Sequence, residues 1–140
     1  MKKKILVISG GISKERAISL NTGKQVANTL AKNNYNVKIT EPNFKLNDVI
    51  KSFKPNIIFN ALHGQFGEDG YIQTILEATG IPYTHSGVIS SAVAMDKALS
   101  KKIFIKNNIL TPRYILYTSK PPYAILIPTR RISFSPYCKV

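Results

Sequence analysis

Two glycine-rich segments carry the side chains best suited to bind a small polar molecule. The first, residues 10–16 (GGISKER), joins the sharply turning pair Gly10 and Gly11 to the carboxylate of Glu15, which could hold an ammonium group. Alternatively, Glu15 is a solvated charge between Lys14 and Arg16, and this segment alone favours that interpretation. The segment matches neither the phosphate-binding P-loop nor the G-x-G-x-x-G pattern of dinucleotide-binding loops.

The second segment, residues 63–70 (HGQFGEDG), is the more specific of the two. It places Gly64, Gly67 and Gly70 within eight residues, which is costly for stability because glycine loses the most conformational entropy on folding. His63 directly follows an apolar run and could donate a hydrogen bond to an oxyanion or a carboxylate. The alternative is a loop histidine bonded to backbone groups, but the position at a strand end favours function.

Few other side chains suggest chemistry. We expect Glu68 to hold the second glycine loop together and Asp69 to cap the following helix, so no metal site is predicted. Lys97, at an expected helix start, could pair with phosphate, or it is a surface lysine like its neighbours. Cys138 is the single cysteine, which excludes an internal disulfide and a cysteine zinc cluster.

Apolar runs predict the strands. Residues 3–9 and 56–62 are typical of strands buried on both faces, and residues 35–39 alternate as in a half-exposed strand. Short strands are also expected at residues 81–84 and 114–117.

Helical periodicity and capping residues predict the helices. The first is expected from about Ser19 to Asn33, capped by either Ser13 or Ser19, with an apolar stripe that includes Gly23 and Ala27. A short amphipathic helix is expected over residues 46–53. Further helices are expected after the candidate caps Asp69, Ser86 and Asp96.

The alternation of strands and helices indicates an α/β fold with a doubly wound parallel sheet. Ligands of such sheets bind beyond the carboxyl ends of the strands. Both glycine-rich segments follow expected buried strands. We therefore expect them to meet at one edge of the sheet and form one site.

The net charge of +13 is unevenly distributed along the 140 residues. The first 96 residues contain 11 basic residues and all 7 acidic ones, whereas the last 44 contain 9 basic residues and none that are acidic. Because the excess belongs mostly to the C-terminal third, nucleic-acid binding is disfavoured. No apolar run is long enough to cross a membrane, no signal peptide is apparent, and a cytoplasmic protein is expected.

Three segments in register resemble D-alanine–D-alanine ligase: residues 10–20 (GGISKERAISL), 60–70 (NALHGQFGEDG) and 86–97 (SGVISSAVAMDK). The resemblance spans residues 4 to about 117. It implies a Rossmann-like domain that precedes the ATP-grasp domains, themselves absent here. Two positions depart from the family pattern, Thr74 in place of a smaller residue and His85 in place of glycine, and both bear on local loop packing.

The resemblance implies ATP-dependent joining of two D-alanines for peptidoglycan synthesis and cell-wall shape. Glu15 would hold the ammonium of the first D-alanine, His63 would stabilise the acyl phosphate and the tetrahedral oxyanion, and Lys97 would contact ATP phosphates. The glycine loops would surround the substrate. ATP and Mg²⁺ are expected to serve the full-length family, with neither bound tightly by this chain alone. The resemblance also implies homodimerisation through this domain.

The expected domains are residues 1–118, the ligase N-terminal domain, and residues 119–140, a basic, proline-rich tail typical of a frameshift or truncation. Little or no ligase turnover is expected from the chain alone. The alternatives are a non-catalytic module that binds a small molecule or dimerises, and a basic nucleic-acid binder.

Overall fold

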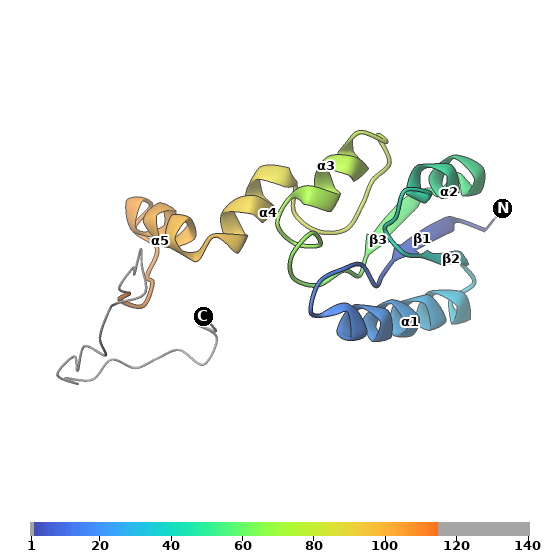
Figure 1. Ribbon diagram of the computed structural model, residues 1–140, viewed down its shortest axis with the longest axis horizontal. Helices are drawn as coiled ribbons and strands as arrows, with labels where there is room; N and C mark the ends of the chain where they lie inside the picture. The colour runs from blue at the N-terminus through green and yellow to red at the C-terminus, as the bar shows by residue number, and fades with distance from the viewer. Residues whose placement is uncertain (1, 115–140) are drawn as a thin grey trace. The chain divides into compact units, whose positions relative to one another are not determined.

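The computed structural model describes residues 2–114, and the expectations for the tail and for most of residues 114–117 lie outside that range. Three strands form its parallel sheet: β1 (Lys4–Ile8), β2 (Asn36–Thr40) and β3 (Ile57–Asn60) (Figure 1). Their order is β2-β1-β3, so β1 lies in the centre with Ile5 opposite both Val37 and Ile57. The predicted strand at residues 81–84 contributes a single bridge, between Ile58 and Tyr83.

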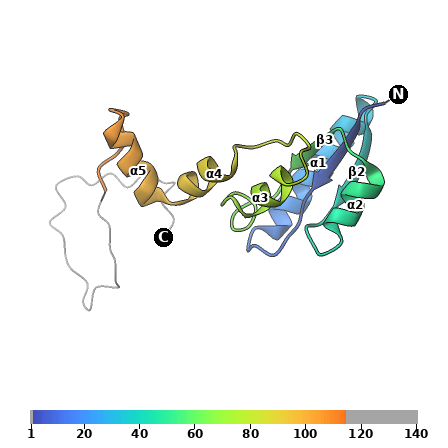
Figure 2. The same cartoon turned by 90° about the horizontal axis from the view of Figure 1, so that it is seen from above.

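The described range contains five helices, and Figure 2 shows them from above. They are α1 (Arg16–Lys32), α2 (Leu46–Phe53), α3 (Tyr71–Glu77), α4 (Val88–Met95) and α5 (Lys97–Lys106). The chain divides into two compact units between Lys97 and Ala98. The sheet and the first four helices therefore belong to the first unit. No helix of residues 2–114 has the length and apolar character needed to span a bilayer.

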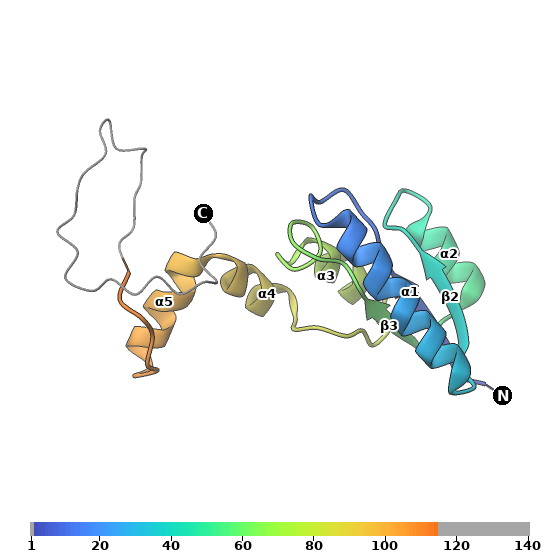
Figure 3. The same cartoon turned by 90° about the horizontal axis from the view of Figure 1, so that it is seen from below.

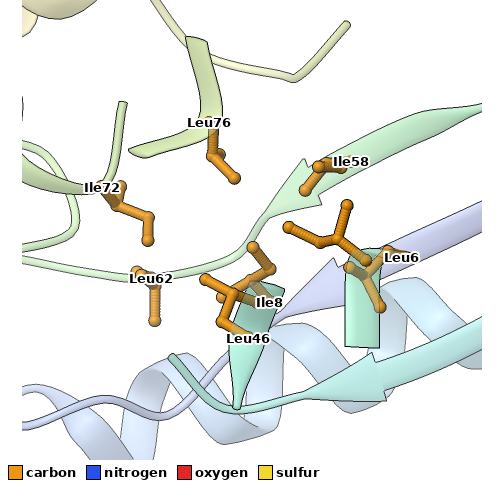
Figure 4. Close-up of a cluster of buried hydrophobic side chains, with 8 residues drawn as sticks. Leu6, Ile8, Leu46, Ile58, Leu62, Ile72 and Leu76 are labelled. Atoms are coloured by element: carbon orange, nitrogen blue, oxygen red, sulfur yellow. The ribbon is translucent and has the colours of Figure 1, made fainter. Parts of the chain in front are cut away.

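Helices cover both faces of the sheet, which confirms the doubly wound α/β prediction. The alternating side chains of β1 divide between the two layers: Leu6 and Ile8 pack toward α2 and α3, whereas Ile5 and Val7 pack toward Ala27 of α1. Figure 3 shows α1 lying across one face of the sheet. Figure 4 shows the larger of the two hydrophobic clusters, which lies on the opposite face. That cluster comprises Leu6, Ile8, Leu46, Ile50, Ile58, Leu62, Ile72 and Leu76.

Several predicted helix starts were displaced because their caps have other roles. α1 begins at Arg16, capped by Glu15, because the amide of Ser19 already bonds to the carbonyl of Glu15. Neither Ser13 nor Ser19 is the N-cap. α3 is capped by Gly70, one residue after Asp69.

The start of α4 was also displaced by one residue. Its N-cap is Gly87, and the Ser86 carbonyl instead accepts a hydrogen bond from the Ser91 hydroxyl. The three cap predictions were wrong because the helices begin after Glu15, Gly70 and Gly87, none of which makes a side-chain capping bond.

In the second unit, Lys101 is more than the surface lysine predicted. Its ammonium donates to Thr111 Oγ1 at 3.0 Å and to the Pro112 carbonyl at 2.8 Å. It also lies 5.2 Å from the ring centroid of Tyr114. Lys101 therefore fixes the segment that follows α5 against that helix.

Candidate functional site

The two glycine loops lie against each other at the carboxyl ends of β1 and β3, as predicted. Ser13 joins them directly: its hydroxyl donates to the His63 carbonyl at 2.8 Å and accepts from the Glu15 amide at 3.2 Å. One side chain of the first loop therefore sets the position of the first residue of the second.

Glu15 also contacts the second loop through its side chain. Gly64 has φ +70°, and a Cβ at that position would collide with the Glu15 carboxylate. Glu15 caps α1 through its backbone and makes no side-chain capping bond. The structure thus presents an exposed carboxylate next to the loop that carries His63.

His63 has polar partners on both sides of its ring. Its Nε2 lies 3.1 Å from the Thr22 hydroxyl, and its Nδ1 lies 4.0 Å from a Glu68 carboxylate oxygen. At 4.0 Å the Glu68 carboxylate lies beyond hydrogen-bond range of Nδ1, so it acts on the ring only through its charge. About a third of the His63 side chain (34%) remains exposed, so an anionic ligand can reach it.

Carboxylates close the second loop on itself. Glu68 accepts from the Gly64 amide at 2.8 Å, which confirms its expected role of holding the loop together. Asp69 accepts from the Phe66 amide at 2.8 Å and from the Tyr71 amide at 3.1 Å. Asp69 therefore secures the loop and the first turn of α3 together.

Two buried amides anchor the middle of this loop from below. The Gly67 carbonyl accepts from Asn60 Nδ2 and from Gln73 Nε2, both at 2.9 Å. Asn60 Oδ1 in turn accepts from the Leu62 amide at 3.1 Å. Asn60 and Gln73 are 1% and 0% exposed, so these bonds are shielded from water.

The first loop has a simpler anchor. The buried Ser19 hydroxyl accepts from the Gly10 amide at 2.8 Å and donates to the Ala61 carbonyl at 2.7 Å. Gly10 and Gly11 have φ values of +89° and +80°, a conformation that favours glycine. Ser19 thus ties the turn after β1 to the end of β3.

A pocket of about 430 Å³ opens beside the two loops. His63 and Ser13 contribute polar groups to its lining, and Phe44 and Tyr71 contribute aromatic rings. Phe44 is 89% exposed, which leaves much of the apolar wall in contact with solvent. The pocket extends to the loop after β2.

Lys97 binds locally within the first unit. Its ammonium donates to the Ala94 carbonyl at 2.9 Å, and its side chain is exposed. Within residues 2–114, no group of three or more His, Cys, Asp and Glu side chains gathers in a way that could hold a metal ion.

The two departures from the family pattern are accommodated in different ways. The Thr74 hydroxyl donates to the Gly70 carbonyl at 2.9 Å, within the first turn of α3. His85 adopts φ +91°, and its Nδ1 lies 3.1 Å from Asn60 Nδ2. Nearby, the pKa of Tyr83 is raised by burial, by its hydrogen bond to Glu77 and by the negative charge of Glu77.

Sequence reasoning did not single out four polar residues that organise this site: Ser13 as a bridge, Ser19 as an anchor, Thr22 and Asn60. Asn60 offered a usable signal, because a polar residue at the end of an otherwise apolar strand is rarely left without partners. The partners of the other three come from distant segments, which periodicity does not reveal.

Comparison with known proteins places this chain in a family. Residues 38–86 match the profile described as "D-ala D-ala ligase N-terminus". The D-alanine–D-alanine ligase of Pelagibacter ubique is 70% identical over 120 residues, covering 86% of this chain and 40% of the relative. The D-alanine–D-alanine ligase of Wolbachia sp. subsp. Brugia malayi is 49% identical over 113 residues, covering 80% of this chain and 33% of the relative. The chain thus spans well under half the length of these relatives.

Solved structures agree with the sequence matches. The D-alanine–D-alanine ligase of Bacillus anthracis complexed with ATP superposes with a TM-score of 0.72 at 40% identity, over 82% of this chain and 38% of that one. The D-alanyl-alanine synthetase A of Vibrio cholerae superposes with a TM-score of 0.73 at 26% identity, over 86% and 42%. Together with the geometry of the two glycine loops, these matches show that the chain belongs to the D-alanine–D-alanine ligase family and carries its N-terminal domain.

Proposed function

We propose that this chain supplies the part of a D-alanine–D-alanine ligase that binds the first D-alanine. The observation that carries the proposal is the Ser13 bridge, which places the backbone of Glu15 and that of His63 on one hydroxyl. D-alanine is a zwitterion, so its two charged groups need partners of opposite character at close range. Glu15 and His63 would provide them.

Each side chain has a role that follows from its chemistry. The Glu15 carboxylate would hold the ammonium group through charge-assisted hydrogen bonds. His63 would donate to the substrate carboxylate, then to the acyl phosphate and the oxyanion of the tetrahedral intermediate, where negative charge develops. Glu68 would help by keeping the loop closed through its bond from the Gly64 amide.

In the proposed reaction, ATP phosphorylates the carboxylate of the first D-alanine. The amine of the second D-alanine then attacks the acyl carbon and forms the peptide bond, with phosphate leaving. The relative from Bacillus anthracis has been solved in complex with ATP. An enzyme that consumes ATP for peptidoglycan precursors would act in the cytoplasm, and we include that location in the proposal.

Binding of ATP with Mg²⁺ would require groups in addition to those of residues 2–114. Lys97 is the candidate cation for ATP phosphates, but its ammonium is bonded to the Ala94 carbonyl. Residues 2–114 offer no cluster of carboxylates for Mg²⁺. We propose that residues 2–114 contribute substrate binding, and we expect the 140-residue chain by itself to form no dipeptide from D-alanine and ATP. Measurable ATP-dependent dipeptide formation would contradict this expectation.

Titration of the chain with D-alanine, followed by NMR, tests the binding proposal. We expect D-alanine to shift the backbone amides of Glu15, His63 and Gly64, and L-alanine to bind less well. Glu15→Gln should weaken D-alanine binding about tenfold or more, because it removes a charge-assisted contact. The matched control is Glu77→Gln, which retains an acceptor for Tyr83 and should leave binding unchanged. No shifts with D-alanine, or equal binding by the Glu15→Gln variant, would refute the proposal.

Homodimerisation stays a prediction from the family resemblance, and sedimentation measurements over a range of concentrations would test it. A non-catalytic binding module and a nucleic-acid binder are the remaining alternatives. Strongly salt-dependent binding of nucleic acid would favour the latter.

A further inference from the structure

His85 touches the buried framework of the site although it lies outside both glycine loops. Its Nδ1 is 3.1 Å from Asn60 Nδ2, and the same Asn60 amide group donates to the Gly67 carbonyl at 2.9 Å. A single buried amide therefore links an exposed histidine to the loop that carries His63 and Glu68.

The hydrogen-bond network fixes which atom donates in this contact. The Gly67 carbonyl can only accept and the Leu62 amide can only donate, so the orientation of the Asn60 amide is determined. Its nitrogen faces His85, and a primary amide nitrogen offers only hydrogens. His85 Nδ1 must therefore accept, which requires a neutral ring with its proton on Nε2.

The backbone of His85 is strained in a way that this bond can offset. Its φ of +91° lies in the left-handed region that residues other than glycine rarely adopt. The adjacent Thr84 hydroxyl accepts from the backbone amide of Asn60 at 3.0 Å, so two consecutive residues of this segment attach to Asn60. The segment is held on the other side by Glu77, which accepts from Tyr83 Oη and from the Val88 amide.

From these contacts we infer that His85 is a pH-dependent positioning residue for the site loop of residues 63–70, acting through Asn60 on the Gly67 carbonyl. When the ring takes up a proton, Nδ1 becomes a donor and faces another donor at 3.1 Å. Either the His85 ring moves away, so that the side-chain amide of Asn60 loses an acceptor, or the Asn60 side chain rotates and displaces the Gly67 carbonyl that it holds. Both changes loosen the anchor under His63.

Other titratable groups surround this network and must be separated from His85. Glu77 of α3 and Tyr83 contact the segment around His85, while His63, Glu68 and Asp69 belong to the site loop itself. Histidines change charge between about pH 5 and 8, so His63 is the group whose titration most needs to be distinguished.

Two substitutions of His85 divide its possible roles. His85→Asn keeps an acceptor, because Oδ1 is attached to Cγ just as Nδ1 is, and asparagine tolerates a positive φ. It cannot be protonated in this range. His85→Gly suits the backbone and removes the acceptor. Together, the two variants distinguish the effect of the hydrogen-bond acceptor at residue 85 from the effects of backbone strain and of ring protonation.

The experiment follows the Gly67 and Glu68 backbone amides and the Asn60 side-chain amide by NMR in the 140-residue chain from pH 8 to 5. We expect the Asn60 side-chain signal to titrate in the wild type, to keep its pH 8 position throughout in His85→Asn, and to stay near its wild-type pH 5 position at every pH in His85→Gly. Amide hydrogen exchange in the loop should quicken several-fold at pH 8 in His85→Gly and remain near wild type in His85→Asn. Any pH response of the Gly67 and Glu68 backbone amides that persists in His85→Asn is assigned to His63. That response should vanish in the double variant that also carries His63→Asn.

A full wild-type titration of the Asn60 signal in His85→Asn, or wild-type signals and exchange in His85→Gly at pH 8, would overturn the inference. The inference deepens the proposed function, yet its readout needs no substrate. If these signals respond as expected while D-alanine fails to bind, the proposed function fails alone. If D-alanine binds and the signals ignore His85, this inference fails alone.

Discussion

The glycine loop after β1 and the glycine loop after β3 face the same edge of the sheet but are held in different ways. The first is anchored by the hydroxyls of Ser19 and Ser13. The second rests on the amides of Asn60 and Gln73 and is closed by the carboxylates of Glu68 and Asp69.

This difference fits the task of each loop. The second loop must hold an imidazole in place, and its glycines supply no side-chain packing of their own, so buried polar anchors replace it. The first loop leads directly into α1, whose helical hydrogen bonds position Glu15. A loop that continues into a helix needs fewer anchors than one that must support itself.

The largest effect is expected when the anchor of the second loop is removed. Asn60→Ala leaves the Gly67 carbonyl with one amide partner and the buried Leu62 amide without its side-chain acceptor. We expect a loss of about 3 kcal/mol in the free energy of unfolding, because unsatisfied buried groups cost about 1–3 kcal/mol each. Urea denaturation measures the loss, and the exposed Asn28→Ala in α1 serves as control. If Asn60→Ala were as stable as Asn28→Ala, the second loop would not depend on its buried amide anchor, and the contrast between the two loops would be lost.

A smaller loss is expected when the first loop loses its buried anchor. Ser19→Ala deprives the Gly10 amide and the Ala61 carbonyl of their shared hydroxyl partner. We expect a cost of about 2 kcal/mol, since two groups in a buried environment lose a partner while the helix persists. Ser52→Ala, at an exposed position of α2, is the matched control. A cost larger than that of Asn60→Ala would reverse the ranking of the two anchors.

The smallest effect on stability is expected at the bridge between the loops. Ser13→Ala removes partly exposed hydrogen bonds, so the free energy of unfolding should fall by about 1 kcal/mol or less. D-alanine binding should nevertheless weaken several-fold, because Glu15 and His63 lose their common support. Calorimetric titration measures the binding, with the exposed Ser90→Ala as control. Unchanged binding would show that the loops hold their positions without the bridge.

Patterns of apolar residues predicted the parts of the fold that depend on local sequence. The run at residues 3–9 became β1, and the amphipathic stretch at residues 46–53 became α2. The start of α1 was missed because its first residues, Arg16 to Ile18, are exposed and show no apolar period. Such a helix start depends on the backbone bond from the Arg16 amide to the Ser13 carbonyl rather than on burial.

The polar contacts were harder to foresee. Serine is a residue type that often caps helices, but the Ser19 hydroxyl instead bonds to Gly10 and Ala61 once α1 packs on the sheet. Likewise, the role of His85 depends on Asn60, 25 residues earlier. Hydrogen bonds between distant segments leave no periodic trace in a sequence, because they are set by how the elements pack.

The sequence by itself determined that the chain is α/β, that two glycine loops follow buried strands, and that Glu15 and His63 are the residues to examine. Apolar periodicity and glycine spacing are local properties, and they survive without knowledge of the fold. Only the tertiary structure decided that Ser13 joins the two loops, that Asn60 and Gln73 carry the second loop, and that His85 reaches this network. Those outcomes follow because most buried polar groups must find a partner, and the available partners are known only after the sheet and helices have come together.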